Sequence, residues 1–186
     1  SQLGLLILLV GQPDRGVALA GIALLGAHAM FKASLFLTVG VVDAATGTRD
    51  LRELSGLHRS LRWAFIPAVL AIASMVGLPP FAGYVGKEAA LYALLEVDGP
   101  EALATTVVVV VGSILTVAYG ARFLWGAFAD KRGREPNEVD REARGLFVSP
   151  NVLAVLGLVA GCFPAAGEML LQPYAETYPS GELGHL

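Results

Sequence analysis

The sequence has little of what soluble catalytic or secreted domains depend on. Cys162 is its single cysteine, which excludes an internal disulfide and a thiolate metal site. Only 16% of the 186 residues are charged, against roughly 25% in soluble domains. The net charge is −3, and the lysines and arginines gather in two loops, so we expect no nucleic-acid partner.

The motifs of the common enzyme classes are also missing. The sequence contains no P-loop, no dinucleotide-binding glycine fingerprint, no HExxH helix and no nucleophile elbow. Its three histidines and one cysteine lie far apart, which argues against a zinc site. We therefore expect no metal, no cofactor and a function other than enzymatic catalysis.

Apolar residues dominate what is present. The chain is 55% hydrophobic with a mean hydropathy of +0.63, which is typical of membrane proteins. A helix that crosses a bilayer needs roughly 20 apolar residues. The pattern predicts an all-α polytopic membrane protein with a helix end, four crossings and a polar tail, over residues 1–10, 17–42, 63–95, 102–128, 150–171 and 172–186.

The first apolar segment is incomplete. The sequence begins at Ser1, and residues 1–10 are too short to span a bilayer. They lack the basic region and the cleavage site of a signal peptide. We expect the chain to begin inside a transmembrane helix and to be a piece of a longer protein.

The basic residues predict an orientation. Residues 43–62 contain four arginines, and residues 129–149 contain five lysines and arginines. The segment 96–101 and the tail 172–186 contain none. Because loops rich in Lys and Arg stay on the cytoplasmic side, we expect both basic loops in the cytoplasm of a cell whose plasma membrane holds the chain, and the tail outside.

The segment 63–95 carries an interruption. As one helix its 33 residues would measure about 50 Å, well beyond the roughly 30 Å hydrocarbon core. Gly77, Pro79 and Pro80 fall near its middle and disfavour a continuous helix. The charge rule places its two flanks on opposite sides, so we expect one crossing made of a discontinuous helix. Such irregular backbone must face protein or a water-filled cavity.

Two titratable residues lie inside the first full crossing. Lys32 is ten residues, or about 15 Å, from the nearer end of its span, too far to reach the interface easily. A lysine at that depth costs roughly 2.5–3.5 kcal/mol and marks a functional site by default. His28 lies one turn earlier, on the same face. We favour a proton relay over the alternatives, a static ion pair for Lys32 and a hydrogen-bonded core position for His28.

A second pair follows the interruption. Lys87 lies about 12 Å from the end of its span, beside the expected break, where a titratable group is well placed for an ion path. Glu88 is its neighbour in sequence and points elsewhere on a helix, so it either takes part in the proton relay or pairs with a neighbouring helix. A purely structural ion pair is the alternative for Lys87. Ser113, Thr116 and Tyr119 are expected to be packing residues.

Two segments carry a family resemblance. HAMFKASLFLTVG (28–40) and GLPPFAGYVGKEAAL (77–91) resemble motifs of the antiporter-like membrane subunits shared by respiratory complex I and the multisubunit Mrp-type Na⁺/H⁺ antiporters. VVDAATGTRDLREL (41–54) is most similar to the Mrp-type A subunit. The resemblance extends over residues 1–128.

The resemblance implies a core of fourteen helices in two inverted repeats, each with a discontinuous helix at a proton half-channel. This chain would form the later part of that core. The family's relay in the eleventh helix corresponds to His28 and Lys32, and the lysine of its broken twelfth helix corresponds to Lys87. Many relatives carry a further histidine where this sequence has Leu24. The implied partners are other subunits of an antiporter complex, the lipid bilayer, protons and sodium.

Three functions remain open from the sequence. The chain could form part of a cation/proton antiporter that exchanges sodium for protons. It could belong to the corresponding proton-pumping subunit of complex I, or it could be a structural membrane subunit with static buried ion pairs. The first repeat, with its glutamate and lysine, is absent from this sequence, so we expect this chain alone to provide half of a proton path.

Overall fold

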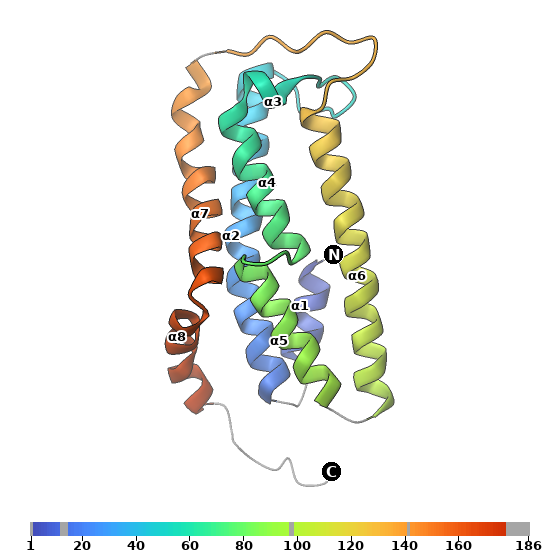
Figure 1. Ribbon diagram of the computed structural model, residues 1–186, viewed down its shortest axis with the longest axis vertical. Coiled ribbons are helices and arrows are strands. Elements are labelled where there is room, and N and C mark those ends of the chain that lie inside the picture. Colours follow the sequence, from blue (N-terminus) through green and yellow to red (C-terminus); the bar gives the residue numbers. More distant parts are fainter. Residues whose placement is uncertain (1, 12–14, 97–98, 141, 178–186) are drawn as a thin grey trace.

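The computed structural model describes residues 2–11, 15–96, 99–140 and 142–177, which form an elongated bundle of helices without a strand (Figure 1). The all-α fold class is thereby confirmed. The elements are α1 (Gln2–Val10), α2 (Arg15–Thr46), α3 (Leu57–Ser60), α4 (Arg62–Val76), α5 (Ala82–Glu96), α6 (Pro100–Phe128), a 3₁₀ turn η1 (Glu142–Phe147), α7 (Val148–Cys162) and α8 (Pro164–Thr177).

The central element is α2, which contacts α1, α4, α5 and α7. Its 32 residues make a helix of about 48 Å, and it extends beyond both ends of the expected crossing 17–42. In the described part of the chain, three helices are long and apolar enough to cross a membrane, namely Gly16–Thr46, Pro100–Phe128 and Gly145–Cys162.

The expected crossing 63–95 is built from two half-helices. α4 and α5 have 15 residues each, about 22 Å, and lie end to end beside α2 (Figure 1). α4 ends at Gly77, which has a φ of 90° and donates its N–H to the carbonyls of Ala73 and Ser74. Pro79 and Pro80 then separate it from α5. The expected discontinuous helix is confirmed.

Two glycines allow the break to pack closely. A Cβ atom on Gly83, in the first turn of α5, would lie 1.8 Å from the carbonyl oxygen of Ser74 in α4. A Cβ atom on Gly161, near the end of α7, would lie 2.1 Å from the carbonyl oxygen of Pro80. The end of α4, the connecting segment and α7 are therefore in backbone contact, with no space for any side chain at these two positions.

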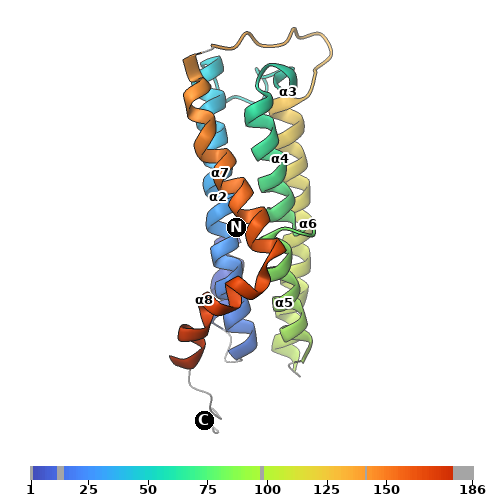
Figure 2. The ribbon, with the colours of Figure 1, turned by 60° about the vertical axis from the view of Figure 1, so that its left-hand side comes forward.

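Where one crossing over 150–171 was expected, the structure has two helices. α7 ends at Cys162, and α8 runs from Pro164 at an angle to it (Figure 2). Phe163 adopts a non-helical conformation with a ψ of 64°, because the residue before a proline is disfavoured in the helical region. The expected polar tail 172–186 is also partly helical, since α8 continues to Thr177; residues 178–186 lie outside the described residues.

The two basic loops lie at the same end of the bundle and are bonded to each other (Figure 1). The backbone N–H of Asn137 donates to the Ser55 carbonyl at 3.0 Å, and its side-chain oxygen accepts from the Ser55 N–H at 2.6 Å. Arg59 pairs with Asp130 at 3.2 Å. Lys131 donates to the carbonyls of Leu51 and Gly126, and partial burial lowers the pKa of its ammonium.

We predict that Gly83→Ala destabilises the fold strongly. Overpacking a buried site usually costs about 1–3 kcal/mol, and here the new methyl meets backbone that cannot rotate away, so we expect a loss of about 3 kcal/mol or more. The measurement is the melting temperature in detergent and the yield of folded protein. Gly40→Ala, where nothing lies within 4 Å, is the matched control. Equal melting temperatures for the two variants would contradict the close packing.

Candidate functional site

Lys32 lies near the middle of α2 and reaches towards α6. Its Nζ donates a hydrogen bond to the hydroxyl of Tyr119 at 2.6 Å and lies 5.0 Å from the centre of that ring. Among the described residues, the ion pairs are those that Asp130 makes with Arg59 and His58, so Lys32 has no carboxylate partner there. Among the described residues, its ammonium contacts the hydroxyl and the ring face of Tyr119.

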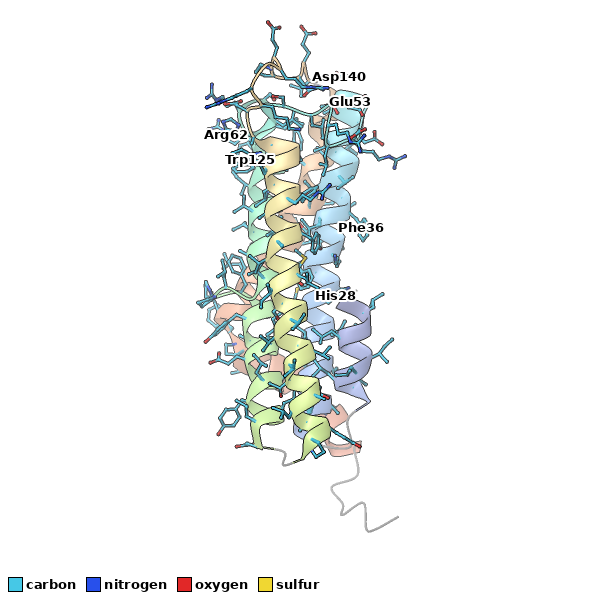
Figure 3. The ribbon with its side chains drawn as sticks, turned by 90° about the vertical axis from the view of Figure 1, so that its right-hand side faces the viewer. His28, Phe36, Glu53, Arg62, Trp125 and Asp140 are labelled. Carbon is cyan, nitrogen blue, oxygen red and sulfur yellow. The ribbon has the colours of Figure 1, made fainter. Side chains whose placement is uncertain are left out.

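A small cavity lies beside the Lys32 side chain. Its volume is about 140 Å³, and its wall includes Ile72 of α4 and Tyr119 and Phe123 of α6. Liquid water takes about 30 Å³ per molecule, so the cavity is large enough for several. Phe36, one turn after Lys32 on α2, lines the same cavity and is exposed on the flank of the bundle (Figure 3).

His28 lies one turn before Lys32 on α2 (Figure 3). Its Nδ1 is buried and is without a hydrogen-bond partner in the described part of the chain. The ring packs edge-on against Phe31 with a centroid distance of 5.2 Å. A buried polar atom without a partner costs about 1–3 kcal/mol, so the nitrogen is available to a water molecule or a proton donor. Between the proton relay and the hydrogen-bonded core position, the role of His28 stays a prediction.

Lys87 is 7% exposed and reaches back from α5 to the end of α4. Its Nζ donates to the carbonyl oxygens of Met75 at 2.8 Å and Val76 at 3.0 Å. The last carbonyls of a helix lack intrahelical partners and carry the negative end of the helix dipole. Lys87 therefore supplies both a positive charge and hydrogen bonds to the interrupted end of α4.

Tyr119 links these two lysines. Its hydroxyl accepts from Lys32 and lies 2.7 Å from the sulfur of Met75, to which it donates. The carbonyl of the same methionine accepts from Lys87. A continuous series of contacts thus runs from Lys32 through Tyr119 and Met75 to Lys87. Tyr119 was expected only to pack, because its partner Lys32 is 87 residues away and no local pattern indicates such a contact.

Glu88 is not part of this series. It is exposed, and it lines an open pocket with Pro79, Pro80 and Tyr84 on the outer side of the break. Residues adjacent in sequence point about 100° apart on a helix, which accounts for the separation from buried Lys87. The structure therefore brings Lys32 and Lys87 together through intermediates and leaves Glu88 at a different surface.

Leu24 occupies the position one turn before His28. It is buried, and a Cβ atom on Gly86 would lie 2.9 Å from its Cα, so α2 and α5 touch there through their backbones. It belongs to an apolar cluster that also contains Leu9, Ala90 and Leu94. On the side of His28 towards the start of α2, the interface of α2 and α5 is thus apolar. In the described chain, no group of three or more His, Cys, Asp or Glu could hold a metal ion.

Known proteins of similar sequence include antiporter subunits. The chain is 34% identical over 165 residues to the Na⁺/H⁺ antiporter A1 subunit of Staphylococcus haemolyticus, covering 83% of this chain and 20% of that protein. It is 35% identical over 187 residues to the Na⁺/H⁺ antiporter A subunit of Alkalihalophilus pseudofirmus, covering 88% of this chain and 23% of that protein. The chain therefore spans about a fifth of the length of these relatives.

A solved structure has the same fold. It is the Mrp complex from Dietzia sp. DQ12-45-1b, in which one chain matches with a TM-score of 0.79 and 34% identity, over 97% of this chain and 20% of that chain. Residues 1–116 match the family described as NADH:quinone oxidoreductase/Mrp antiporter, transmembrane. These residues include α2, the break and both lysines. The chain belongs to the NADH:quinone oxidoreductase/Mrp antiporter transmembrane family.

Proposed function

We propose that this chain is part of the A subunit of an Mrp-type Na⁺/H⁺ antiporter, in which it forms one half of a proton path. Its similarity to known A subunits supports the assignment to a transporter. The path would use Lys32, His28 and Lys87 as groups that gain and lose protons in turn. No chemical bond to a substrate is made, and the sodium gradient would drive proton movement in the complex.

One observation carries this proposal. Lys87 is buried in an apolar bundle and Lys32 is half-buried on its flank. Neither has a carboxylate partner among the described residues, and intermediates in direct contact connect them. The α4 carbonyls accept hydrogen bonds from Lys87 and carry the negative end of the helix dipole, which favours a positive charge there. A small movement of the α4 end would therefore change the balance between its two protonation states. His28 presents an unpaired nitrogen one turn from Lys32, from which a proton could be passed through water.

Glu88 would act at the outer side of the break. It is exposed beside Pro79 and Pro80, where a carboxylate can attract cations without carrying a buried charge. The apolar contact between Leu24 and Gly86 would close the interface below His28 to water. The other half of the proton path would come from parts of the protein outside this chain, with the further subunits of the complex as partners.

We also infer the orientation in the membrane. The basic loops 43–62 and 129–149 would lie in the cytoplasm, and the tail 172–186 would lie outside a plasma membrane. Both loops are at one end of the bundle and are held together by hydrogen bonds, which supports a common side (Figure 1). Between the loop 43–62 and the segment 96–101 the chain runs once along the bundle, through α4 and α5, which supports the opposite side for that segment.

The corresponding subunit of complex I is the second candidate, because the matched family includes it. There the same lysines would move protons, driven by electron transfer from NADH to quinone. The two functions are separated by a flux assay in membrane vesicles without NADH. Proton movement in response to added sodium alone supports the antiporter, and proton movement only on NADH oxidation supports complex I.

The first test of the relay uses Lys32→Ala in the complete antiporter complex. We expect sodium-dependent proton flux in everted vesicles to fall more than tenfold while the complex assembles normally, because the titratable group is lost from the path. Arg132→Ala, in an exposed loop position, is the control and should leave the flux unchanged. A wild-type flux in Lys32→Ala would rule out the relay.

A second test separates a relay from a purely structural role at Lys87. Lys87→Arg keeps the positive charge and the donors for the α4 carbonyls, but an arginine does not lose its proton in proteins. We expect the variant to assemble and to lose antiport by more than tenfold. Assembly is measured by recovery of the intact complex. Full antiport in Lys87→Arg would show that Lys87 serves only to hold the end of α4.

A further inference from the structure

We propose that Tyr119 is a positioning residue that couples the protonation state of Lys32 to the end of α4 that holds Lys87. The inference rests on the proposed function, since it assumes that Lys32 changes its protonation state during transport. Tyr119 is on α6, which contributes no other residue to the series of contacts between the two lysines.

The packing of α6 on α4 positions the Tyr119 hydroxyl between Lys32 and Met75. Gly120, the next residue, lies against α4: a Cβ atom on it would be 2.9 Å from Cγ2 of Ile72 and 3.5 Å from Cε of Met75. The absence of a side chain at Gly120 allows the two helices to approach at this level. The Tyr119 hydroxyl then lies within hydrogen-bond distance of both Lys32 and the sulfur of Met75.

The chemistry of the hydroxyl makes it responsive to Lys32. A phenol has one hydrogen to donate, and its oxygen can accept. A protonated Lys32 is a donor only, so the hydroxyl accepts from it and its hydrogen stays directed at Met75, in keeping with the 2.6 Å and 2.7 Å contacts. A neutral Lys32 has a lone pair that can accept the same hydrogen. Deprotonation of Lys32 would therefore allow the hydroxyl to turn from Met75 to the lysine nitrogen.

Met75 connects the Tyr119 hydroxyl to the break between α4 and α5. Met75 is fully buried in the last turn of α4, and its carbonyl oxygen is one of the two that accept from Lys87. Losing the hydrogen bond at its sulfur releases one of the contacts that hold this turn. Since Lys87 is bonded to the same turn, its surroundings change when Lys32 loses its proton. Tyr119 thus provides a physical connection between two titrating sites on different helices.

Few other charged groups face Lys32. On its own helix the neighbour is His28, and α6 offers Tyr119. Arg122, one turn further along α6, lines a separate pocket with Leu51 and Arg52 at the loop end. The ionisable group that α5 brings to the series is Lys87, while α4 carries only Arg62 at its far end and α7 carries only Cys162. In the described part of the chain, the Tyr119 hydroxyl is the polar partner bonded to Lys32.

The test is Tyr119→Phe in the complete antiporter complex, with sodium-dependent proton flux measured across a range of pH. The ring and its packing are kept while the hydroxyl is lost. We expect a roughly tenfold lower flux at the wild-type optimum and an altered pH profile, because Lys32 has lost the hydroxyl that accepts its hydrogen bond. Tyr92→Phe, at an exposed position near the end of α5, is the matched control and should resemble wild type.

A second variant tests the connection on the far side of Tyr119. Met75→Leu conserves the buried volume and removes the sulfur, while the bond between Lys32 and Tyr119 remains. We expect a reduced flux with little displacement of the pH profile. Combining it with Tyr119→Phe should reduce the flux no further than Tyr119→Phe alone, because both variants interrupt one series of contacts.

The outcomes distinguish this inference from the proposed function. Loss of flux in Lys32→Ala together with a wild-type rate and pH profile in Tyr119→Phe would overturn the role of Tyr119 and leave the relay intact. A wild-type flux in Lys32→Ala would overturn both. If Tyr119→Phe does not assemble, the flux of Met75→Leu tests the coupling instead. Wild-type flux in that variant overturns the coupling, and reduced flux in an assembled complex supports it.

Discussion

The structure depends on how the interrupted helix satisfies its backbone. Inside a bilayer no water is available to the carbonyls that a broken helix leaves free, and each unsatisfied group costs several kcal/mol. Lys87 supplies hydrogen bonds to two of these carbonyls, at Met75 and Val76, and Gly77 closes the last turn of α4. A lysine in this place is thus both a structural cap and a charge at the point where the backbone is least regular.

Close backbone contacts hold the neighbouring helices around this point. Gly83 allows α5 to fold against the end of α4, Gly161 brings α7 against the connecting segment, and Gly86 brings α5 against α2. With no hydrophobic driving force between helices in lipid, such approaches through small residues supply much of the packing energy. They also fix the height at which Lys32 and Lys87 lie relative to each other, because neither α4 nor α5 can slide without a clash.

Most of the fold and part of the site could be predicted from the sequence. The apolar lengths indicated the crossings, Pro79 and Pro80 indicated the break, and the depth of Lys32 and Lys87 within apolar segments marked them as unusual. The end of α7 was missed although Pro164 signals it, since its segment has a high hydropathy throughout. Glu88 was grouped with Lys87 by its place in the sequence, whereas the helix turns it to a different surface.

The sequence by itself determined which segments are apolar enough to enter a membrane, where a helix cannot continue, and which charges lie among apolar neighbours. These properties belong to single segments, because hydropathy and the loss of backbone donors act locally. Only the tertiary structure decided that Lys87 caps α4 and that Tyr119 lies between Lys32 and Met75. Tyr119 is 87 positions from Lys32 and 44 positions from Met75 in the sequence. These contacts depend on how three helices pack, and the local pattern of any one helix does not contain that information.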